Sequence, residues 1–455
     1  MRLVVSKFGG SSVASSEKIK HIVEIMRQDS GRRCIVLSAP GKGPDAGVKV
    51  TDLLIEAVNR AVGKQSYAEP LAAVRERFSA IYRPLGLSAA VLGDVLDDLY
   101  ARLSSPVTHP GKFRDLAVAA GEDINCRLFA AYLNTVGVKA KYVNPKEAGL
   151  TVTPVFGDAQ PLPEAAANLA SLKDVCADAA VVFPGFFGCT ADGDVATFSR
   201  GGSDLTGAIL AEAIDADEYE NWTDVDGIFS AHPLMVDSPE PISALTYKEM
   251  RELSYIGFNV LHEEAVRPVM RKKIPIRLRN TNNIENKGTL IVSERLPDVR
   301  DIVGIASGGG YCSFTIQKYL MNREKGFGRR LLSIFEELNL SYEHCPSGVD
   351  TISVILDQGQ LKSDPENVNR IIRAIDEELT PDEPVRAEYN IALVSVVGEG
   401  LTHKIGVMAT AAGALSKAGV NIKMVNQGSS EISMIFGIDA ADEKRAVNAL
   451  YKEFF

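Results

Sequence analysis

Short apolar runs alternate with longer stretches of helical periodicity along the first two thirds of the chain. Residues 3–5 (LVV) have the length of a buried strand, and Ile19, Ile22 and Met26 then recur on one face of a helix. Further strands are predicted near residues 35, 140, 181, 219 and 276, and they alternate with helical stretches. Strands and helices that alternate in this way form a mostly parallel sheet with helices on both faces. We therefore expect a three-layer αβα domain with a mainly parallel sheet.

The pattern changes after a predicted strand at residues 289–292, where a short polar link with a proline follows at 295–298. Downstream, four positions recur 80 residues later: Gly326, Gly348, Ile352 and Ser353 correspond to Gly406, Gly428, Ile432 and Ser433. The repeat predicts two similar modules, each in the order strand, helix, strand, strand, helix. The predicted elements are 311–317, 326–339, 341–345, 351–356 and 366–379 in the first module, and 390–397, 405–418, 420–425, 431–437 and 441–453 in the second.

The second module ends on a helix and lacks a last strand. Residues 301–306 (DIVGIA), just before the first module, have the apolar pattern of a strand and are the candidate to supply it. We therefore expect the first module to be inserted within the second. The predicted domains are residues 1–296, residues 310–385, and a third domain made of 299–309 and 386–455.

The composition is that of a globular protein that stays inside the cell. Of the 455 residues 45% are hydrophobic, enough to bury two or three cores, and no apolar run approaches the ~18 residues of a membrane span. The chain opens with a predicted strand instead of a signal peptide, and its six cysteines lack the spacing of a zinc site or a disulfide framework. A formal net charge of −10 argues against nucleic acid. We expect a cytoplasmic protein without a membrane or nucleic-acid partner.

A glycine-rich turn follows the first predicted strand. Lys7 precedes Gly9 and Gly10, and the hydroxyls of Ser11 and Ser12 follow them. Paired glycines let backbone N–H groups approach an anion closely, the next helix contributes its positive end, and a lysine adds a mobile charge. The lysine precedes the glycines, so the motif is not a P-loop. The turn is a candidate phosphate site, and the alternative is a plain strand-to-helix turn.

A second glycine-rich turn opens a later helix. Residues 200–204 (RGGSD) stand between a predicted hairpin at 181–199 and apolar positions with helical spacing. Ser203 or Asp204 can cap this helix, and Asp204 is also a candidate to orient a nucleophile or take its proton. In the alternative interpretation, Asp204 only caps the helix and pairs with Arg200.

These segments resemble the signatures of the aspartate kinases, within the amino-acid kinase superfamily. The resemblance is carried, in order over nearly the whole chain, by residues 7–13 (KFGGSSV), 121–122 (GE), 198–204 (FSRGGSD), 223–228 (TDVDGI) and 276–281 (IRLRNT). It implies an amino-acid kinase domain followed by two ferredoxin-like (βαββαβ) ACT domains, which sense amino acids. It also implies ATP-dependent phosphorylation of the β-carboxylate of L-aspartate to 4-phospho-L-aspartate, the first step of the aspartate-family amino-acid pathway.

The resemblance further implies which residues act on the phosphoryl group. Lys7 and the amides near Gly9, Gly10 and Gly202 would stabilise it during transfer, a reaction that needs charge neutralisation and alignment more than covalent help. Asp204 matches a residue usually given an orienting or base role. A carboxylate acceptor has no proton to lose at neutral pH, so we expect Asp204 to orient.

The substrate aspartate would be recognised at both ends. Arg200 matches the arginine that holds its α-carboxylate, and Glu122 matches the acid that meets its α-ammonium. Further substrate-binding positions implied by the resemblance are Ser38, Thr51, Phe186 and Ser203. Without the resemblance to the family, Glu122 could equally be an ordinary acidic residue in the first turn of a helix.

The nucleotide site departs from the commoner pattern of the family. The implied nucleotide-binding residues are Lys7, Gly10, Ser11, Gly202, Thr223, Asp224, Phe229 and Asn259. Asn259 replaces a lysine that reaches the phosphates, and residues 257–262 (GFNVLH) look like a subgroup of monofunctional bacterial aspartate kinases. Arg267, Arg271 or a shifted lysine are the candidate substitutes. Mg²⁺ would arrive with ATP, held mainly by the phosphates, so no metal site made by the protein is expected.

The predicted effector residues surround the start of a helix in the first module: Met321, Gly326, Phe327, Gly328, Ser341, Glu343 and Asp350. Backbone N–H groups there suit an effector carboxylate, and the two acids suit amino groups. A dibasic effector such as lysine fits, and the family offers lysine and/or threonine. The alternative is that both acids are ordinary surface residues. In the second module Asn421, Gln427 and Glu431 hold comparable positions, which we expect to form an interface instead of a second site.

Two other functions stay open at this point. One is a kinase of the same superfamily that acts on another small acid, although the paired modules favour aspartate. The other is a catalytically silent amino-acid sensor, which only the substitution at Asn259 supports. The length predicts a monofunctional enzyme without a homoserine dehydrogenase domain. The ACT domains predict a homodimer, or a tetramer.

Overall fold

The computed structural model describes residues 2–43, 47–199, 201–258, 261, 263–362 and 366–455. They form two compact units. The first comprises Met1–Ile228, Pro241–Tyr247 and Asn259–Pro297, and the second comprises Phe229–Glu240, Lys248–Phe258 and Asp298–Phe455.

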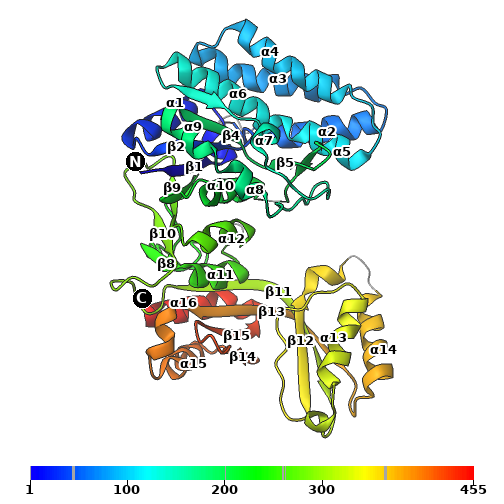
Figure 1. The fold of residues 1–455 in the computed structure, drawn as a ribbon. Helices are drawn as coiled ribbons and strands as arrows, with labels where there is room; N and C mark the ends of the chain where they lie inside the picture. Colours follow the sequence, from blue (N-terminus) through cyan, green and yellow to red (C-terminus); the bar gives the residue numbers. More distant parts are fainter. Residues whose placement is uncertain (1, 44–46, 200, 259–260, 262, 363–365) are drawn as a thin grey trace. The chain divides into compact units, whose positions relative to one another are not determined.

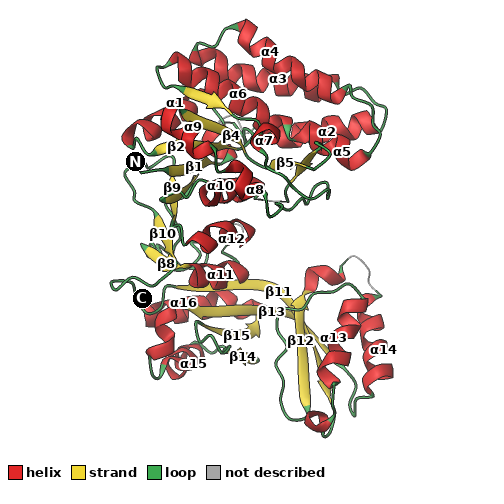
Figure 2. Cartoon of the chain, viewed as in Figure 1, coloured by secondary structure: helices red, strands yellow, loops and turns green. Residues whose placement is uncertain are grey.

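An eight-stranded sheet runs through the first unit (Figures 1 and 2). Its strands are, in spatial order, β3 (Ala140–Tyr142), β4 (Ala180–Pro184), β2 (Arg32–Leu37), β1 (Val4–Phe8), β7 (Glu218–Thr223), β9 (Ile276–Asn280), β10 (Thr289–Val292) and β8 (Ala244–Thr246). Neighbouring strands are parallel except β9 and β10. Every strand predicted for this domain is present, whereas β8 was not predicted. The mainly parallel sheet is confirmed.

Helices cover both faces of this sheet. On one face Phe8, Ile35 and Val182 share a core with α1 (Ser16–Gln28) and α6 (Ala120–Thr135). The same core includes α2 (Val50–Val62), α3 (Ala68–Tyr82), α4 (Ala89–Leu103) and α5 (Pro110–Val118). On the other face α10 (Gly202–Ala213) packs on β1, β2 and β7, as Figure 1 shows. The three-layer αβα architecture predicted from the sequence is confirmed.

Shorter elements complete the first unit. The predicted hairpin is present, because β5 (Phe187–Cys189) pairs antiparallel with β6 (Val195–Thr197). The remaining elements are the 3-10 turn η1 (Gly10–Val13) and the helices α7 (Pro145–Ala148), α8 (Ala165–Leu169), α9 (Leu172–Asp178) and α12 (Glu263–Lys272).

The second unit is built on one five-stranded antiparallel sheet in the order β12 (Thr351–Asp357), β11 (Gly304–Gln317), β13 (Arg386–Val397), β15 (Ser433–Asp439) and β14 (Met424–Asn426). β11 is one long strand. Its first residues, 304–308, pair with 393–397 of β13, and residues 311–317 pair with β12. An inserted first module would produce this pairing, and the division into the three domains given above stays a prediction.

Helices pack on this sheet in two groups. α13 (Phe327–Glu337) and α14 (Asn367–Leu379) share a core with β11 and β12, while α15 (Val407–Lys417) and α16 (Glu443–Phe454) share a core with β13 and β15. α11 (Tyr247–Tyr255) also lies largely in this unit. Its Glu252 accepts a hydrogen bond from Ser433 Oγ over 2.7 Å.

One predicted strand is wrong. Residues 341–345 form no strand and make only an isolated bridge, between His344 and Ile355. Backbone bonds to β12 continue at Ser353, whose N–H donates to Pro346 O over 3.0 Å, but a proline has no N–H to extend the ladder. In the second module the corresponding strand, predicted at 420–425, is confined to Met424–Asn426.

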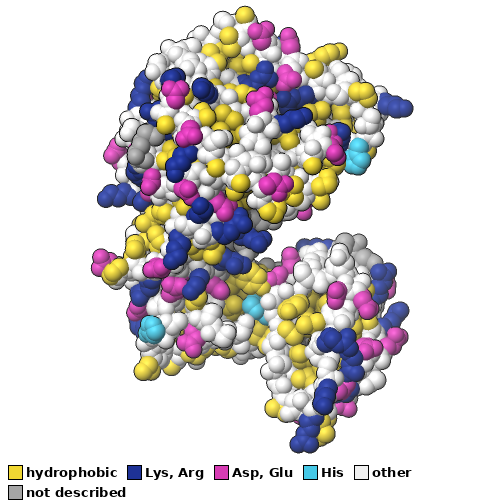
Figure 3. Space-filling model, in the orientation of Figure 1, with side chains coloured by type: hydrophobic (Ala, Val, Ile, Leu, Met, Phe, Trp, Pro, Cys, Tyr) yellow, Lys and Arg dark blue, Asp and Glu magenta, His cyan; other side chains and the backbone are white. Residues whose placement is uncertain are grey.

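Acidic and basic side chains are interspersed over the face of the described residues that Figure 3 shows, so that opposite charges screen one another there. Among the helices of the described residues, none is both long and apolar enough to span a bilayer. All six cysteines are free thiols.

Candidate active site

A cavity of about 610 Å³ lies where β1 and β2 end and α10 begins. Ligands of open α/β sheets bind at this carboxyl edge of the strands. The predicted site residues that line it are Lys7, Gly9, Gly10, Ser11, Ser38, Thr51, Glu122, Phe186, Gly202, Ser203, Asp204 and Asp224. The structure therefore brings most of the predicted catalytic and substrate residues to one place, although they come from segments far apart in the chain.

Two glycines hold the loop after β1 against the loop after β2. The N–H of Gly41 donates to the carbonyl oxygen of Gly10 over 2.9 Å. A Cβ on Gly10 would lie 2.9 Å from Ala39 O, and a Cβ on Gly41 would lie 2.9 Å from the carbonyl carbon of Gly10. Side chains are excluded at both positions because the two backbones touch.

The second glycine pair starts α10 at the cavity. Gly201 is the N-cap residue, with a left-handed φ of 78°. A Cβ on Gly202 would lie 2.8 Å from the Cβ of Phe198 and 2.9 Å from Cδ2 of Phe186, so a glycine is needed there too. The predicted cap is wrong, since the helix begins at Gly202 and Asp204 lies inside its first turn, with no side-chain cap at Gly201.

Asp204 pairs with the lysine of the first turn. Lys7 Nζ lies 2.5 Å from Asp204 Oδ1, and both side chains are largely buried. Asn221 joins the pair: its Nδ2 donates to Asp204 Oδ1 over 3.0 Å, and its Oδ1 accepts from Lys7 Nζ over 3.3 Å. The alternative pairing of Asp204 with Arg200 concerns a residue outside the described ones.

Glu122 is buried in the first turn of α6, with one carboxylate oxygen, Oε2, left without a hydrogen-bond partner among the described residues. Burial raises the pKa of Glu122 to about 8, although backbone N–H groups of Ala39 and of Glu122 itself oppose the shift. A buried acid with one free carboxylate oxygen at a cavity suits a ligand with an ammonium group, which would restore its charged form.

The nucleotide residues are only partly brought together. Asp224 lines the cavity, and Thr223 Oγ1 donates to Asp224 Oδ1 over 3.3 Å at the end of β7. Phe229 belongs to the second compact unit. Asn259, like Arg200, lies outside the described residues.

Neither arginine proposed as a substitute cation lines the cavity among the described residues. Arg271 instead pairs over 2.8 Å with Glu212, near the far end of α10, and Arg267 is exposed on α12.

Two exposed lysines at the cavity, Lys42 and Lys49, were not predicted as site residues. Lys42 could have been predicted from the sequence. It lies between two glycines, at residues 41–43 (GKG), in a turn that follows β2 in the same way as the first glycine-rich turn follows β1. Asn221, also missed, carried the weaker signal of one amide in a buried strand.

The predicted effector residues lie around the start of α13. Gly326 is its N-cap residue, with a φ of 78°, and Met321 is buried in the preceding turn η3 (Met321–Arg323). Asp350 Oδ1 already accepts from Leu320 N over 2.8 Å, and Ser341 Oγ donates to Gln360 Oε1 over 3.1 Å. The backbone N–H of Glu343 donates to Ile355 O over 2.7 Å, and its carbonyl oxygen accepts from the Tyr255 hydroxyl over 3.1 Å. Burial and the nearby Glu343 carboxylate raise the pKa of Tyr255, so this carboxylate already has a neighbour.

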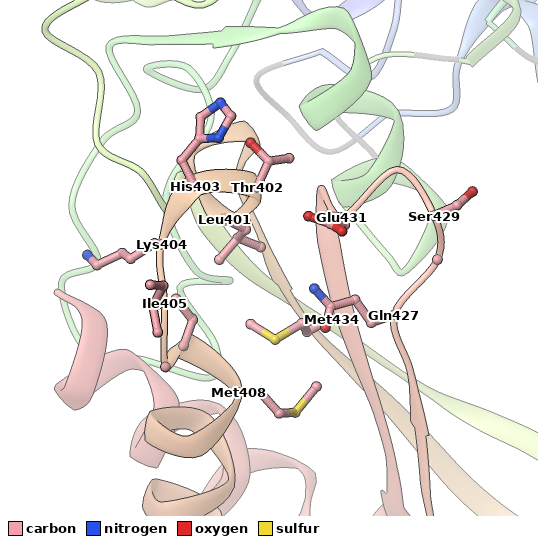
Figure 4. Close-up of a pocket in the computed structure, with 13 residues that line it drawn as sticks. Leu401, Thr402, His403, Lys404, Ile405, Met408, Gln427, Ser429, Glu431 and Met434 are labelled. Carbon is pink, nitrogen blue, oxygen red and sulfur yellow. The ribbon is translucent and has the colours of Figure 1, made fainter.

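The corresponding region of the second module contains a cavity of about 580 Å³. Figure 4 shows the Leu401 and Met434 side chains between the segment that carries Lys404 and the loop that carries Gln427. Glu431 also lines it, whereas Asn421 does not. The sequence predicted an interface here, and the cavity identifies a second place where a small ligand would fit.

Comparison with known proteins links these features. The model of the amino acid kinase family matches residues 2–280, and an ACT domain model matches residues 394–454. Aspartokinase 3 of Bacillus subtilis (strain 168) is 50% identical over 451 residues, which cover 99% of this chain and 98% of the relative.

Solved structures agree with this comparison. The crystal structure of the aspartate kinase of Clostridium acetobutylicum superposes with a TM-score of 0.88 at 36% identity and covers 100% of both chains. Aspartokinase III of Escherichia coli matches with a TM-score of 0.76 at 26% identity, both with aspartate and ADP bound (R-state) and with lysine and aspartate bound (T-state). These matches cover 100% of this chain and 100% and 99% of the E. coli chains.

Proposed function

Since the chain belongs to the amino acid kinase family and is an aspartate kinase, we propose that it transfers the γ-phosphoryl group of ATP to the β-carboxylate of L-aspartate. The bond between the γ-phosphorus and the oxygen that bridges to the β-phosphate breaks, and a β-carboxylate oxygen of aspartate forms the new bond. The products are ADP and 4-phospho-L-aspartate. The observation that carries this proposal is the buried Glu122 carboxylate, whose Oε2 has no partner among the described residues, in a cavity that also holds the Lys7–Asp204 pair.

Charge is the first requirement of this reaction, because both reactants are anions. Lys7 is the cation placed for it, since a Cβ on Gly9 would lie only 3.5 Å from Lys7 Nζ, beside the glycine turn. The start of α10 at Gly202 adds the positive end of a helix dipole. Asp204 orients Lys7 and takes no proton from the substrate.

Aspartate recognition follows from the acid that lines the same cavity. Glu122 would bind the α-ammonium, and the proposed partner of the α-carboxylate is Arg200. Ser38 and Thr51, which line the same cavity, supply hydroxyls that suit either carboxylate. The structure of the E. coli enzyme with aspartate and ADP supports this choice of ligands.

ATP would bind on the side of Asp224, with Lys42 and Lys49 as the cations for its phosphates. No group of three or more His, Cys, Asp or Glu side chains among the described residues is arranged to hold a metal ion. Mg²⁺ would arrive with ATP and be held mainly by its phosphates, as is usual for this small, strongly hydrated ion.

Lysine is the effector that the comparisons support best, because the E. coli relative is described with lysine bound in its T-state. We place it at the start of α13, where Glu343 meets one amino group. An effector of this kind acts by binding the less active arrangement more tightly than the active one. Regulation by threonine, and a homodimer or tetramer formed through the ACT domains, are further parts of this proposal.

The test is ATP-dependent formation of aspartyl hydroxamate by the purified full chain with Mg²⁺. Lys7→Ala removes the proposed cation, and Lys139→Ala is the matched control, since Lys139 pairs with Asp178 on the surface. We expect turnover in the wild type and in Lys139→Ala, and its loss in folded Lys7→Ala. Turnover with another small acid but not with aspartate would contradict the substrate, and no turnover with any acid would favour a silent sensor.

A further inference from the structure

Two residues of β7 face the start of α10. Tyr219 and Asn221 are two positions apart, so their side chains lie on the same face of the sheet. The Tyr219 hydroxyl donates to the backbone carbonyl of Asp204 over 3.0 Å, and its ring lies against Gly207, where a Cβ would come within 2.6 Å. Burial, with the nearby Asp204 charge, raises the pKa of Tyr219 well above its usual value, so this hydroxyl stays a donor.

Asn221 contacts both charged groups of the cavity. It is the register partner of Lys7 on the neighbouring parallel strand, and only 2% of it is exposed. A lysine ammonium only donates hydrogen bonds and a carboxylate only accepts them. The amide can therefore serve both in one orientation alone, with Oδ1 toward Lys7 and Nδ2 toward Asp204, as found.

We propose that Asn221 is a positioning residue for phosphoryl transfer, whose amide fixes Lys7 and Asp204 so that the ammonium keeps an N–H directed at the transferring group. The inference rests on the proposed function. Of the three N–H groups of Lys7, one faces Asp204 and one faces Asn221, which leaves one for the cavity.

Packing between the sheet and α10 does not by itself explain an asparagine at position 221. Strand positions that face a helix are well filled by apolar side chains, and burying an amide is costly unless its hydrogen bonds are made. Both side-chain hydrogen bonds of Asn221 go to residues that line the cavity. Without the amide, Lys7 would be free to rotate about the Asp204 carboxylate, and a misplacement of about 1 Å at a reacting centre can lower a rate by ~100-fold.

The experiment compares Asn221→Leu and Asn221→Asp with the wild type in the full chain. Asn221→Leu keeps the branched shape of the side chain and removes both hydrogen bonds, so kcat should fall about 10- to 100-fold while KM for aspartate and ATP changes about threefold or less. Asn134→Leu is the control, since the Asn134 amide bonds backbone atoms of Ala130 and Ala140 beside the edge strand β3. It should keep the wild-type kcat.

The Asn221→Asp variant tests the role of Asn221 through the pH dependence of kcat, which a loss of packing alone would not change. Its new carboxylate would face Lys7 from β1, Asp204 from α10 and the Tyr219 hydroxyl from its own strand. Two adjacent carboxylates share a proton, and the protonated form again offers one donor and one acceptor. The ratio of variant to wild-type kcat should therefore rise, by about tenfold, as pH falls from 9 to 6.

The outcomes separate the inference from the proposed function. Inactive wild-type protein would contradict the function itself. An active wild type with an Asn221→Leu kcat within about twofold of it, or an Asn221→Asp variant with the wild-type pH profile, would overturn the role of Asn221. Thermal unfolding of each variant establishes that the assay is made on folded protein.

Discussion

The backbone N–H of Gly41 donates to the carbonyl oxygen of Gly10 over 2.9 Å, which ties the loop after β2 to the loop after β1. This contact decides how closely the two walls of the cavity approach. A Cβ on Gly10 would lie 2.9 Å from the carbonyl oxygen of Ala39, a backbone atom that cannot rotate away.

Gly10→Ala should therefore destabilise the protein by about 1–3 kcal/mol and lower kcat at least about tenfold, because the loops must separate. The measurements are urea unfolding and the hydroxamate assay. Gly93→Ala is the control, since a Cβ there meets nothing within 4 Å and Gly93 lies inside α4. It should stabilise by about 0.5–1 kcal/mol. Full activity in Gly10→Ala would show that the loops have room to move.

Glu122 should make stability depend on pH. Burial raises its pKa from an ordinary 4.5 to about 8, so the folded protein holds this proton more tightly than the unfolded chain does. The resulting stabilisation is complete below about pH 4.5 and is lost as pH rises toward 8. The free energy of unfolding of the wild type should thus fall relative to that of Glu122→Gln across this range. Parallel curves in urea titrations would contradict the assignment.

Glu122→Gln should also weaken aspartate binding, because a neutral amide replaces the charged partner of the ammonium. We expect KM for aspartate to rise at least about tenfold, with a smaller change in KM for ATP. Glu147→Gln, on the exposed side of α7, should behave as the wild type. Steady-state kinetics with both substrates varied would detect the difference, and an unchanged KM for aspartate would remove Glu122 from the substrate site.

Lys42 and Lys49 should bind the nucleotide by charge. Lys42→Ala and Lys49→Ala are each expected to raise KM for ATP by about three- to tenfold, with an effect that shrinks as salt increases, because exposed charges are screened. Lys20→Ala, on the exposed face of α1, is the control. If KM for ATP stays constant in both variants, the phosphates take their cations from elsewhere.

If lysine binds in the first module, substitutions in the two modules should affect inhibition by lysine differently. Glu343→Gln should raise the lysine concentration for half inhibition at least about tenfold, because one amino group loses its charged partner. Glu431→Gln, at the cavity of the second module, should keep the wild-type inhibition. The reverse result would place the effector in the cavity of Figure 4.

Patterns that are local in the chain allowed most of the first unit to be predicted. β4 is a short apolar run and β1 begins with two valines, and the turns at Gly9 and Gly201 follow from the few residues around them. The strand predicted at 341–345 failed for a local reason as well. Residues 341–345 (SYEHC) bridge β12 only at His344, and Pro346 interrupts the ladder against β12.

The side chains that complete the cavity depend on register between strands distant in sequence. Lys7 and Asn221 are far apart in the chain and become neighbours only because β1 pairs with β7 in one alignment. The cap was mispredicted because Ser203 and Asp204 are both good capping residues, and only the left-handed turn at Gly201 decides where the helix begins.

The continuous β11 has a consequence for how the second unit of the chain unfolds and evolves. Because one strand of 14 residues is hydrogen-bonded into both modules, neither can be excised as a cassette without cutting the sheet of the other. The two should melt in a single calorimetric transition. A chimera that exchanges one module for that of a relative would need to exchange this shared strand as well.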